Sequence, residues 1–528
     1  MSSSDSSSPT FSPGLPLDKT REHEMTRRIL WKLDIRVVPV LCLLYVSSFL
    51  DRASISNARI AGLERDTHLV GNQYNTVLAV FYVSYVLVNL PSNLILKKIG
   101  ANRWLPFLVT AWGAVTALTG LVNNFSGLLA ARFFLGLCEG GLLSGLMLYL
   151  STMYKRHELQ KRAGLFISMS SLSGAFGGLL ASAIVKMDGV GGLAGWRWIL
   201  ILEGIATALL SIVAVFCLPR GIASAKFLTD EERQFALTRL READIARIDA
   251  PSRGSTEKID VTADDLEKKS PATSTAPVYE IYDDHEQFEW REVVRGICDP
   301  QTLMMSVSGL GMLCSAYSFA YFLPSIVTGL GYSGEEAQLR TSPPYIPAAV
   351  LTVLAAFLCD RLRWRAPVMM MVLPIAMLGY IISIVATDVL DAQNNTQRYA
   401  AVFLIQAGIW PCVPCMLSLL PNNTSGHYKR ATAIAFQAGA ANSSGFIATF
   451  LYTADQAPHY IRGHSITLAF VVLAWIAAAC NVVYCRWENN ARASGRREGN
   501  IRAYQELWDS GKTRAPIGDR HPDFRFTL

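Results

Sequence analysis

The chain has 528 residues, of which 51% are hydrophobic and only 17% are charged. This composition excludes an ordinary soluble enzyme and indicates a polytopic membrane protein. The net charge of +6 does not indicate a nucleic-acid partner, because the lysines and arginines gather in short loops between apolar segments. We therefore expect a multi-pass integral membrane protein that lies in a lipid bilayer and binds no nucleic acid.

Apolar segments of the length that crosses a bilayer recur along the chain, each about 17–25 residues long. The twelve expected spans lie near 35–59, 72–96, 104–122, 128–153, 162–186, 197–217, 301–329, 343–360, 367–387, 399–420, 430–453 and 465–485. The loops after the second, fourth, eighth and tenth spans are basic, with Lys97, Lys155, Arg361 and Lys429 among their residues. Because basic loops resist translocation, both termini are predicted to be cytoplasmic.

A polar stretch in the middle of the chain separates six spans from six. The predicted organisation is a disordered cytoplasmic tail at 1–34, a six-helix bundle at 35–217, a cytoplasmic linker at 218–300, a second six-helix bundle at 301–486 and a cytoplasmic C-terminal tail at 487–528. Within the linker, Thr229 and Glu232 have the spacing of a capping box, which predicts a short amphipathic helix through Ile245.

Ionisable residues inside apolar spans are the clearest functional signal, because a charge in a bilayer is costly and usually marks an ion or substrate pathway. The first span contains Asp51 and Arg52, and the fourth contains Arg132 and Glu139. Arg132 and Glu139 stand seven residues apart and so share one helix face. They can also form a static brace between helices, and Asp51 can cap or pair at a helix end. Longer spans would instead place Asp51 and Arg52 near the outer interface, at the entrance.

Several short motifs are similar to those of one transporter family. They are Phe49-Leu-Asp-Arg52, Gln73-Tyr-Asn75, Leu90-Pro-Ser-Asn93, Arg132 with Glu139-Gly-Gly141, Ser173-Gly-Ala-Phe-Gly-Gly178, Gly195-Trp-Arg-Trp198, Ser318-Phe-Ala-Tyr-Phe-Leu-Pro324 and Pro343-Pro-Tyr345. Together they resemble the anion:cation symporter family of the major facilitator superfamily, in particular its fungal allantoate and nicotinate permease branch. The resemblance covers nearly all of residues 30–490.

The resemblance implies an all-α major facilitator fold with twelve transmembrane helices in two six-helix bundles. It also implies import of a small organic anion together with protons by alternating access, the anion being a carboxylate or a carboxylate-bearing vitamin or nitrogen source. Loop residues Asp360, Arg361 and Arg365 resemble the superfamily's loop signature, whose charges stabilise one conformation of each half.

The same resemblance assigns roles to the buried charges. Arg52 is the leading substrate ligand, because a guanidinium can replace the hydration of a carboxylate with a permanently charged fork. Asp51 and Glu139 match the family's protonation sites. We expect protonation of Glu139 to free Arg132 while the substrate anion neutralises Arg52.

Further polar residues on the spans are candidates for the wall of the substrate cavity. They are Tyr45, Gln406, Trp410, Gln437 and Asn442. Asn442 matches a family position that hydrogen-bonds substrate, whereas hydrogen bonding between helices is an alternative interpretation for Gln437 and Tyr45.

Cofactor and metal chemistry is not predicted. Cys412 and Cys415 have a metal-like spacing but lack a second pair of ligands. The small residues from Gly174 to Gly178 are interpreted as a surface for close helix packing. Asn124 and Asn394 lie in glycosylation sequons within predicted outer loops.

Alternatives to anion import differ in direction or class. The main alternative is proton-coupled export of a secondary metabolite or drug by the same fold. A nutrient sensor and a membrane enzyme are less favoured, because the linker is of ordinary length for two-bundle carriers and no catalytic constellation stands out. The family-based expectation is a monomer in the plasma membrane.

Overall fold

The computed structural model describes residues 19–245, 289–332, 334–362, 365–386, 392–513, 515 and 517–527, and every regular element in these ranges is a helix. The chain separates into two compact units. One contains Leu33–Arg220 and Glu289–Leu528, and the other contains Met1–Lys32 and Gly221–Phe288. The tail before residue 19 and the linker residues 246–288 lie outside the described residues.

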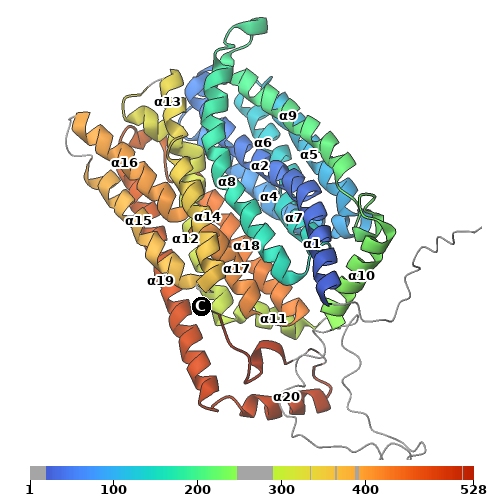
Figure 1. Ribbon diagram of the computed structural model, residues 1–528. Coiled ribbons are helices and arrows are strands. Elements are labelled where there is room, and N and C mark those ends of the chain that lie inside the picture. The colour runs from blue at the N-terminus through green and yellow to red at the C-terminus, as the bar shows by residue number, and fades with distance from the viewer. Residues whose placement is uncertain are drawn as a thin grey trace, which may run out of the picture. The chain divides into compact units, whose positions relative to one another are not determined.

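Seven main helices form the first bundle of the large unit, shown from blue to green in Figure 1. They are α2 (Val38–Ala58), α4 (Gln73–Ile99), α5 (Ala101–Thr119), α6 (Phe125–Glu139), α7 (Leu142–Ser151), α8 (Arg156–Val185) and α9 (Gly195–Cys217). The π-helix η1 (Arg59–Leu63) and the short α3 (Glu64–Asp66) follow α2, and η2 (Val190–Gly192) precedes α9.

The second bundle is built from the C-terminal half of the chain, shown from yellow to red in Figure 1. Its helices are α12 (Pro300–Gly329), α13 (Gly334–Thr341), α14 (Tyr345–Leu362), α15 (Ala366–Val385), α16 (Ala392–Ile409), α17 (Cys412–Asn423), α18 (His427–Thr449) and α19 (Ile461–Ala493). The short α11 (Trp290–Cys298) precedes it, and η5 (Ala454–Gln456), α20 (Gly499–Asp509) and η6 (Gly518–Arg520) complete the chain.

The described helices lie at all twelve predicted spans, although two spans are each divided into two helices. The expected segment 128–153 breaks at Gly140 and Gly141, between α6 and α7. The segment 399–420 breaks before α17 at Pro411, whose ring cannot continue the hydrogen-bond ladder of α16. In the described residues, seven helical segments are long and apolar enough to cross a membrane. The exact number of spans stays a prediction.

The small unit contains the first part of α1 (Lys19–Arg36), η3 (Ile222–Ser224) and α10 (Asp230–Ile245). The predicted capping box at the start of α10 is formed: the Glu232 amide donates to Thr229 Oγ1 at 3.3 Å, and the Thr229 amide donates to Glu232 Oε2 at 3.0 Å. The Glu232 carboxylate also accepts from Lys32 Nζ at 2.7 Å. Lys32 of α1 thus binds the carboxylate that caps the start of α10.

Glycines allow the two bundles to approach closely where α8 packs against α13 and α14. A Cβ atom at Gly174 would collide with the Tyr345 ring, and one at Gly178 would collide with Thr341. The interpretation of this stretch as a packing surface therefore agrees with the structure.

Hydrogen bonds and an ion pair join the bundles near the end where α2 finishes and α4 begins. Ser56 Oγ donates to the Ala320 carbonyl at 3.2 Å, and Asn75 Nδ2 donates to the Thr449 carbonyl at 2.5 Å. The ion pair between Lys186 Nζ and Glu335 Oε1 is 2.9 Å long. This end of the interface is therefore closed.

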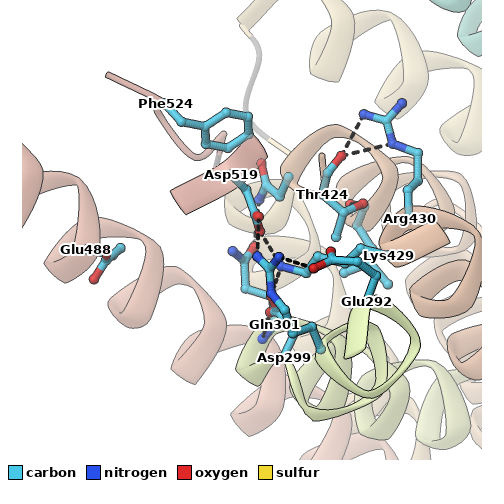
Figure 2. Close-up of polar contacts among 12 residues, drawn as sticks. Glu292, Asp299, Gln301, Thr424, Lys429, Arg430, Glu488, Asp519 and Phe524 are labelled. Carbon is cyan, nitrogen blue, oxygen red and sulfur yellow. Dashed lines mark hydrogen bonds and ion pairs between the residues drawn. The ribbon is translucent and has the colours of Figure 1, made fainter. Parts of the chain in front are cut away.

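The C-terminal strap, which we define as residues 517–527, binds the opposite end of the second bundle. The Thr527 amide donates to Asn423 Oδ1 at 2.8 Å, and the Phe526 amide donates to Asn489 Oδ1 at 2.9 Å. Lys429 Nζ donates to Asp299 Oδ2 at 2.5 Å and also to Asp519 (Figure 2). The predicted tail at 487–528 thus includes the end of α19 and a segment fixed to three bundle helices.

We predict that Lys429→Ala lowers the thermal stability of the purified protein. Lys429 is 4% exposed, and its removal leaves the carboxylates of Asp299 and Asp519 without their shared cation. Breaking a buried pair in this way typically costs about 3–5 kcal/mol. Thermal unfolding in detergent measures the effect, with Lys98→Ala on an exposed helix end as the control. An unchanged melting temperature would show that the strap does not depend on this contact.

Candidate functional site

A buried ion pair joins α2 to α6. Arg52 Nη2 lies 2.5 Å from Glu139 Oε1, and the two side chains are 5% and 1% exposed. Glu139 is the last residue of α6, at the break before α7. The pair leaves hydrogen-bonding capacity unused, because Arg52 Nε and Glu139 Oε2 have no partner in the structure. Arg52 Nε can therefore donate to a further polar group, and Glu139 Oε2 can accept from one.

Aromatic rings surround the Arg52 guanidinium. Its central carbon lies 5.0 Å from the ring centroid of Phe49, 5.7 Å from that of Phe81, and 5.5 Å from those of Tyr85 and Tyr317. Rings at this separation attract a cation through their negative faces. They hold the guanidinium in place without neutralising its charge, which Glu139 compensates.

An enclosed cavity of about 20 Å³ borders this pair. Its walls are Tyr45, Ser48, Phe49, Arg52, Tyr85, Glu139, Leu142, Leu143, Tyr317 and Asn442. This volume is enough for about one water molecule. An organic anion therefore needs the cavity to widen, and the structure represents a closed state of the site.

Four of the predicted site residues lie together at this cavity, and their roles stay predictions. Tyr45, Arg52, Glu139 and Asn442 were expected at the site and all line the cavity. Asn442 Oδ1 accepts a hydrogen bond of 2.8 Å from the Tyr317 hydroxyl, which places α18 and α12 on the side facing Arg52.

Three polar wall residues were not predicted from the sequence: Ser48, Tyr85 and Tyr317. Ser48 stands four residues before Arg52, one helical turn away, and this spacing could have identified it. The tyrosines carried no comparable signal, because aromatic residues in apolar spans usually pack in the core.

The other predicted cavity residues lie beside the cavity or away from it. Trp410 Nε1 donates to Gln406 Oε1 at 2.9 Å, and the Trp410 ring packs edge-on against Phe49 at 5.9 Å. Gln437 Nε2 donates to the Met416 carbonyl at 3.4 Å, as the alternative of hydrogen bonding between helices anticipates. Trp410 thus contacts the wall residue Phe49, and Gln406 is bound to Trp410.

Asp51 points away from Arg52, toward α5. Adjacent residues on a helix are separated by about 100°. The Asp51 carboxylate accepts from Trp112 Nε1 at 3.2 Å and from Thr116 Oγ1 at 3.1 Å, and the residue is 1% exposed. It lies within the helix, so it neither caps the end of α2 nor stands at an entrance.

The partner of Glu139 differs from the expectation. We expected Glu139 to hold Arg132, but its carboxylate is bound by Arg52. Seven residues along one helix correspond to about 10 Å, which is too far for direct contact without bending. Arg132 is 3% exposed, and its Nε has no hydrogen-bond partner in the structure. It lies close enough to Asp51 to act on that carboxylate electrostatically.

The remaining predicted positions lie at helix ends. Arg361 is exposed near the end of α14, and Arg365 is buried at the start of α15. Asn124 caps α6, its Oδ1 accepting from the Gly127 amide at 2.8 Å. The side chains of Asp360 and Asn394 lie outside the described residues.

Metal binding has no support in the described part of the chain, where no three metal-ligating residues of the kind His, Cys, Asp or Glu come together. Cys415 Sγ lies 3.3 Å from Cys359 Sγ, between α17 and α14 in the core of the second bundle.

A larger and more open groove of about 490 Å³ lies at the closed end of the interface, where Gly71 and Asn72 face the segment before α19. It contains none of the buried charges of the two bundles.

Comparison with known proteins gives the family. The model of the Major Facilitator Superfamily matches residues 41–449. The chain belongs to this superfamily. An uncharacterized transporter of Schizosaccharomyces pombe is 35% identical over 465 residues, covering 88% of this chain and 84% of that protein.

Two further similarities bear on function and on fold. The high-affinity nicotinic acid transporter of Saccharomyces cerevisiae is 28% identical over 517 residues, covering 98% of this chain and 87% of that protein. A bacterial homolog to the human lysosomal transporter Spinster, solved in an inward-facing and unoccupied conformation, has a TM-score of 0.58 at 17% identity. The alignment covers 85% of this chain and 96% of that structure. This facilitator is therefore a multi-pass membrane transporter.

We predict that Glu139→Gln lowers the melting temperature of the purified protein, because it leaves the Arg52 guanidinium buried without a counter-charge. The expected cost is about 3–5 kcal/mol. The double variant Arg52→Gln with Glu139→Gln should recover part of this loss, since neither charge then remains. If the two single losses instead add in the double variant, the pair does not stabilise the bundle.

Proposed function

We propose that this facilitator imports a small organic anion together with protons by alternating access. It would do so as a monomer in the plasma membrane with both termini in the cytoplasm. The observation that carries the proposal is the Arg52–Glu139 pair of 2.5 Å at the edge of an enclosed cavity. A buried cation held by a carboxylate that can accept a proton is the arrangement that proton-coupled anion binding requires.

Competition for Arg52 supplies the coupling. When ionised, Glu139 neutralises the guanidinium, and an entering carboxylate would leave the site with excess negative charge. When Glu139 is protonated, it loses its Coulombic attraction to Arg52, and the substrate carboxylate takes its place in a charge-assisted hydrogen bond. Proton binding and anion binding therefore favour one another. This mechanism replaces the expected release of Arg132 by Glu139.

The cavity wall favours a planar anion. Phe49, Tyr85 and Tyr317 present rings around the guanidinium, and a flat ring bearing a carboxylate can stack on them while its carboxylate binds Arg52. Asn442 and Tyr45 supply hydrogen-bonding groups at the same wall. The relative named as a nicotinic acid transporter supports this class of substrate.

Alternating access would open the cavity at one end at a time. The contacts of Ser56 with Ala320 and of Asn75 with Thr449 lie at the predicted extracellular end. In the proposed orientation, these contacts would close the path to the outside. Rocking of one bundle against the other along α8 and α14 would break them and admit substrate. The loop residues Asp360, Arg361 and Arg365 would stabilise one of the two states.

Uptake by a yeast that lacks its own organic-anion permeases tests the proposal. Cells expressing the protein are expected to accumulate labelled nicotinate, allantoate, tartrate or pantothenate faster at acidic pH, and a protonophore should abolish accumulation. Arg52→Ala should lower apparent affinity about tenfold to a hundredfold, since hydrogen bonds to a charged group contribute about 1.5–3 kcal/mol. Arg462→Ala, an exposed arginine outside the cavity, is the matched control.

Three outcomes distinguish the candidate functions. Acid-stimulated uptake that needs Arg52 supports anion import. Uptake that is insensitive to pH and protonophore contradicts the proton coupling. No uptake of any of the four anions, together with a lowered cell content of added compounds, would indicate export instead.

A further inference from the structure

Glu203 is a buried acid that the site described above does not use. It is the ninth residue of α9, which begins at Gly195, and it is 5% exposed. Neither of its carboxylate oxygens has a hydrogen-bond partner in the structure. A buried carboxylate without donors is costly when ionised, far more so than when protonated.

The charged groups around Glu203 come from two helices. Asp51 of α2 and Arg132 of α6 are the ionisable residues that act on it electrostatically. Ser54 of α2 is also close to Glu203, but its hydroxyl donates to the Leu50 carbonyl at 3.0 Å.

The other elements packed on α9 offer no further counter-charge among the described residues. The α5 side presents Trp112 and Thr116, which are neutral and donate to Asp51. In η1, Arg59 is paired with Glu64 at 2.8 Å. After the end of α8, Lys186 is paired with Glu335 of the second bundle. Arg132 is thus the cation that Glu203 shares with Asp51.

Charge balance then points to a proton. The buried cluster contains three carboxyl groups, Asp51, Glu139 and Glu203, and two guanidinium groups, Arg52 and Arg132. Arg52 compensates Glu139, and Arg132 lies near both other acids. Asp51 has two hydrogen-bond donors that stabilise its ionised form, whereas Glu203 has none. One proton on Glu203 makes the cluster neutral.

We propose that Glu203 is a third proton-binding group of the transport cycle, which holds a proton in this conformation and releases it when Arg132 shifts from Asp51 toward Glu203. The proton leaves the Glu203 carboxyl group for water or for the Asp51 carboxylate, and no other bond changes. This inference rests on the proposed proton coupling and extends it. It connects α9 to the Arg52 site through the adjacent residues Asp51 and Arg52 of α2.

Infrared spectroscopy of the purified protein tests the inference without knowledge of the substrate. Wild-type protein at neutral pH should show the C=O stretching band of a protonated carboxylic acid, and Glu203→Gln should lack that component. The band should shift in heavy water and weaken at alkaline pH, because the proton exchanges. Glu203→Asp should keep such a band but at a shifted frequency, because the protonated acid is then an aspartic acid. Glu488→Gln is the matched control, since Glu488 is buried but ion-paired with Arg492 and Arg497.

Two results would overturn the inference. A spectrum unchanged by Glu203→Gln means that Glu203 is ionised, and a band that resists both heavy water and alkaline pH means that its proton is a fixed part of the structure. Melting temperatures of the variants show whether each is folded, and Glu203→Asp decides the matter if Glu203→Gln does not fold.

In the nicotinate uptake assay, Glu203→Gln should alter the pH profile. Absence of uptake by wild type would count against the proposed function, while the infrared result is obtained independently.

Discussion

A charge inside a bilayer must be compensated, and this constraint organises the first bundle. Five ionisable residues of α2, α6 and α9 are at most 5% exposed, and a charge buried in this way is costly unless it has a partner. Arg52 and Glu139 compensate each other directly. Asp51 is stabilised by Trp112 and Thr116. In the proposed mechanism each arrangement also acts as a switch, because a proton or an anion that enters the cluster would change which partners attract one another.

The closed end of the interface and the strap divide the molecule functionally. Gly174 and Gly178 pack closely against α13 and α14, so the proposed rocking of the bundles would take place along this contact. At the opposite end, the C-terminal strap joins Asn423 of α17, Lys429 of α18 and Asn489 of α19, so these helix ends are held together. The proposed alternating access needs movement between the bundles, and these contacts would keep the second bundle together while it moves.

Hydropathy alone was sufficient to predict the helical architecture, because each span must satisfy its own backbone hydrogen bonds in lipid. The buried charges were also predicted from hydropathy, because charged residues are conspicuous in apolar segments. They are Asp51, Arg52, Arg132 and Glu139. Their partners were not predicted. The pairing of Glu139 with Arg52 depends on the packing of α2 against the end of α6, which spacing along one helix does not report. Glu203 was not predicted as a functional residue, although it stands in an equally apolar span. The aromatic wall was missed because rings that hold a cation and rings that fill a core look alike in sequence.

The central claim is that one guanidinium is shared between a proton-binding carboxylate and the transported anion. Calorimetric titration of the purified protein with nicotinate, repeated in buffers of different ionisation enthalpy, measures the protons taken up on binding. The account predicts uptake of about one proton per anion by wild type near neutral pH, and loss of that uptake in Glu139→Gln while the anion still binds. Nicotinate binding without proton uptake by wild type, or equal uptake by both proteins, would contradict it.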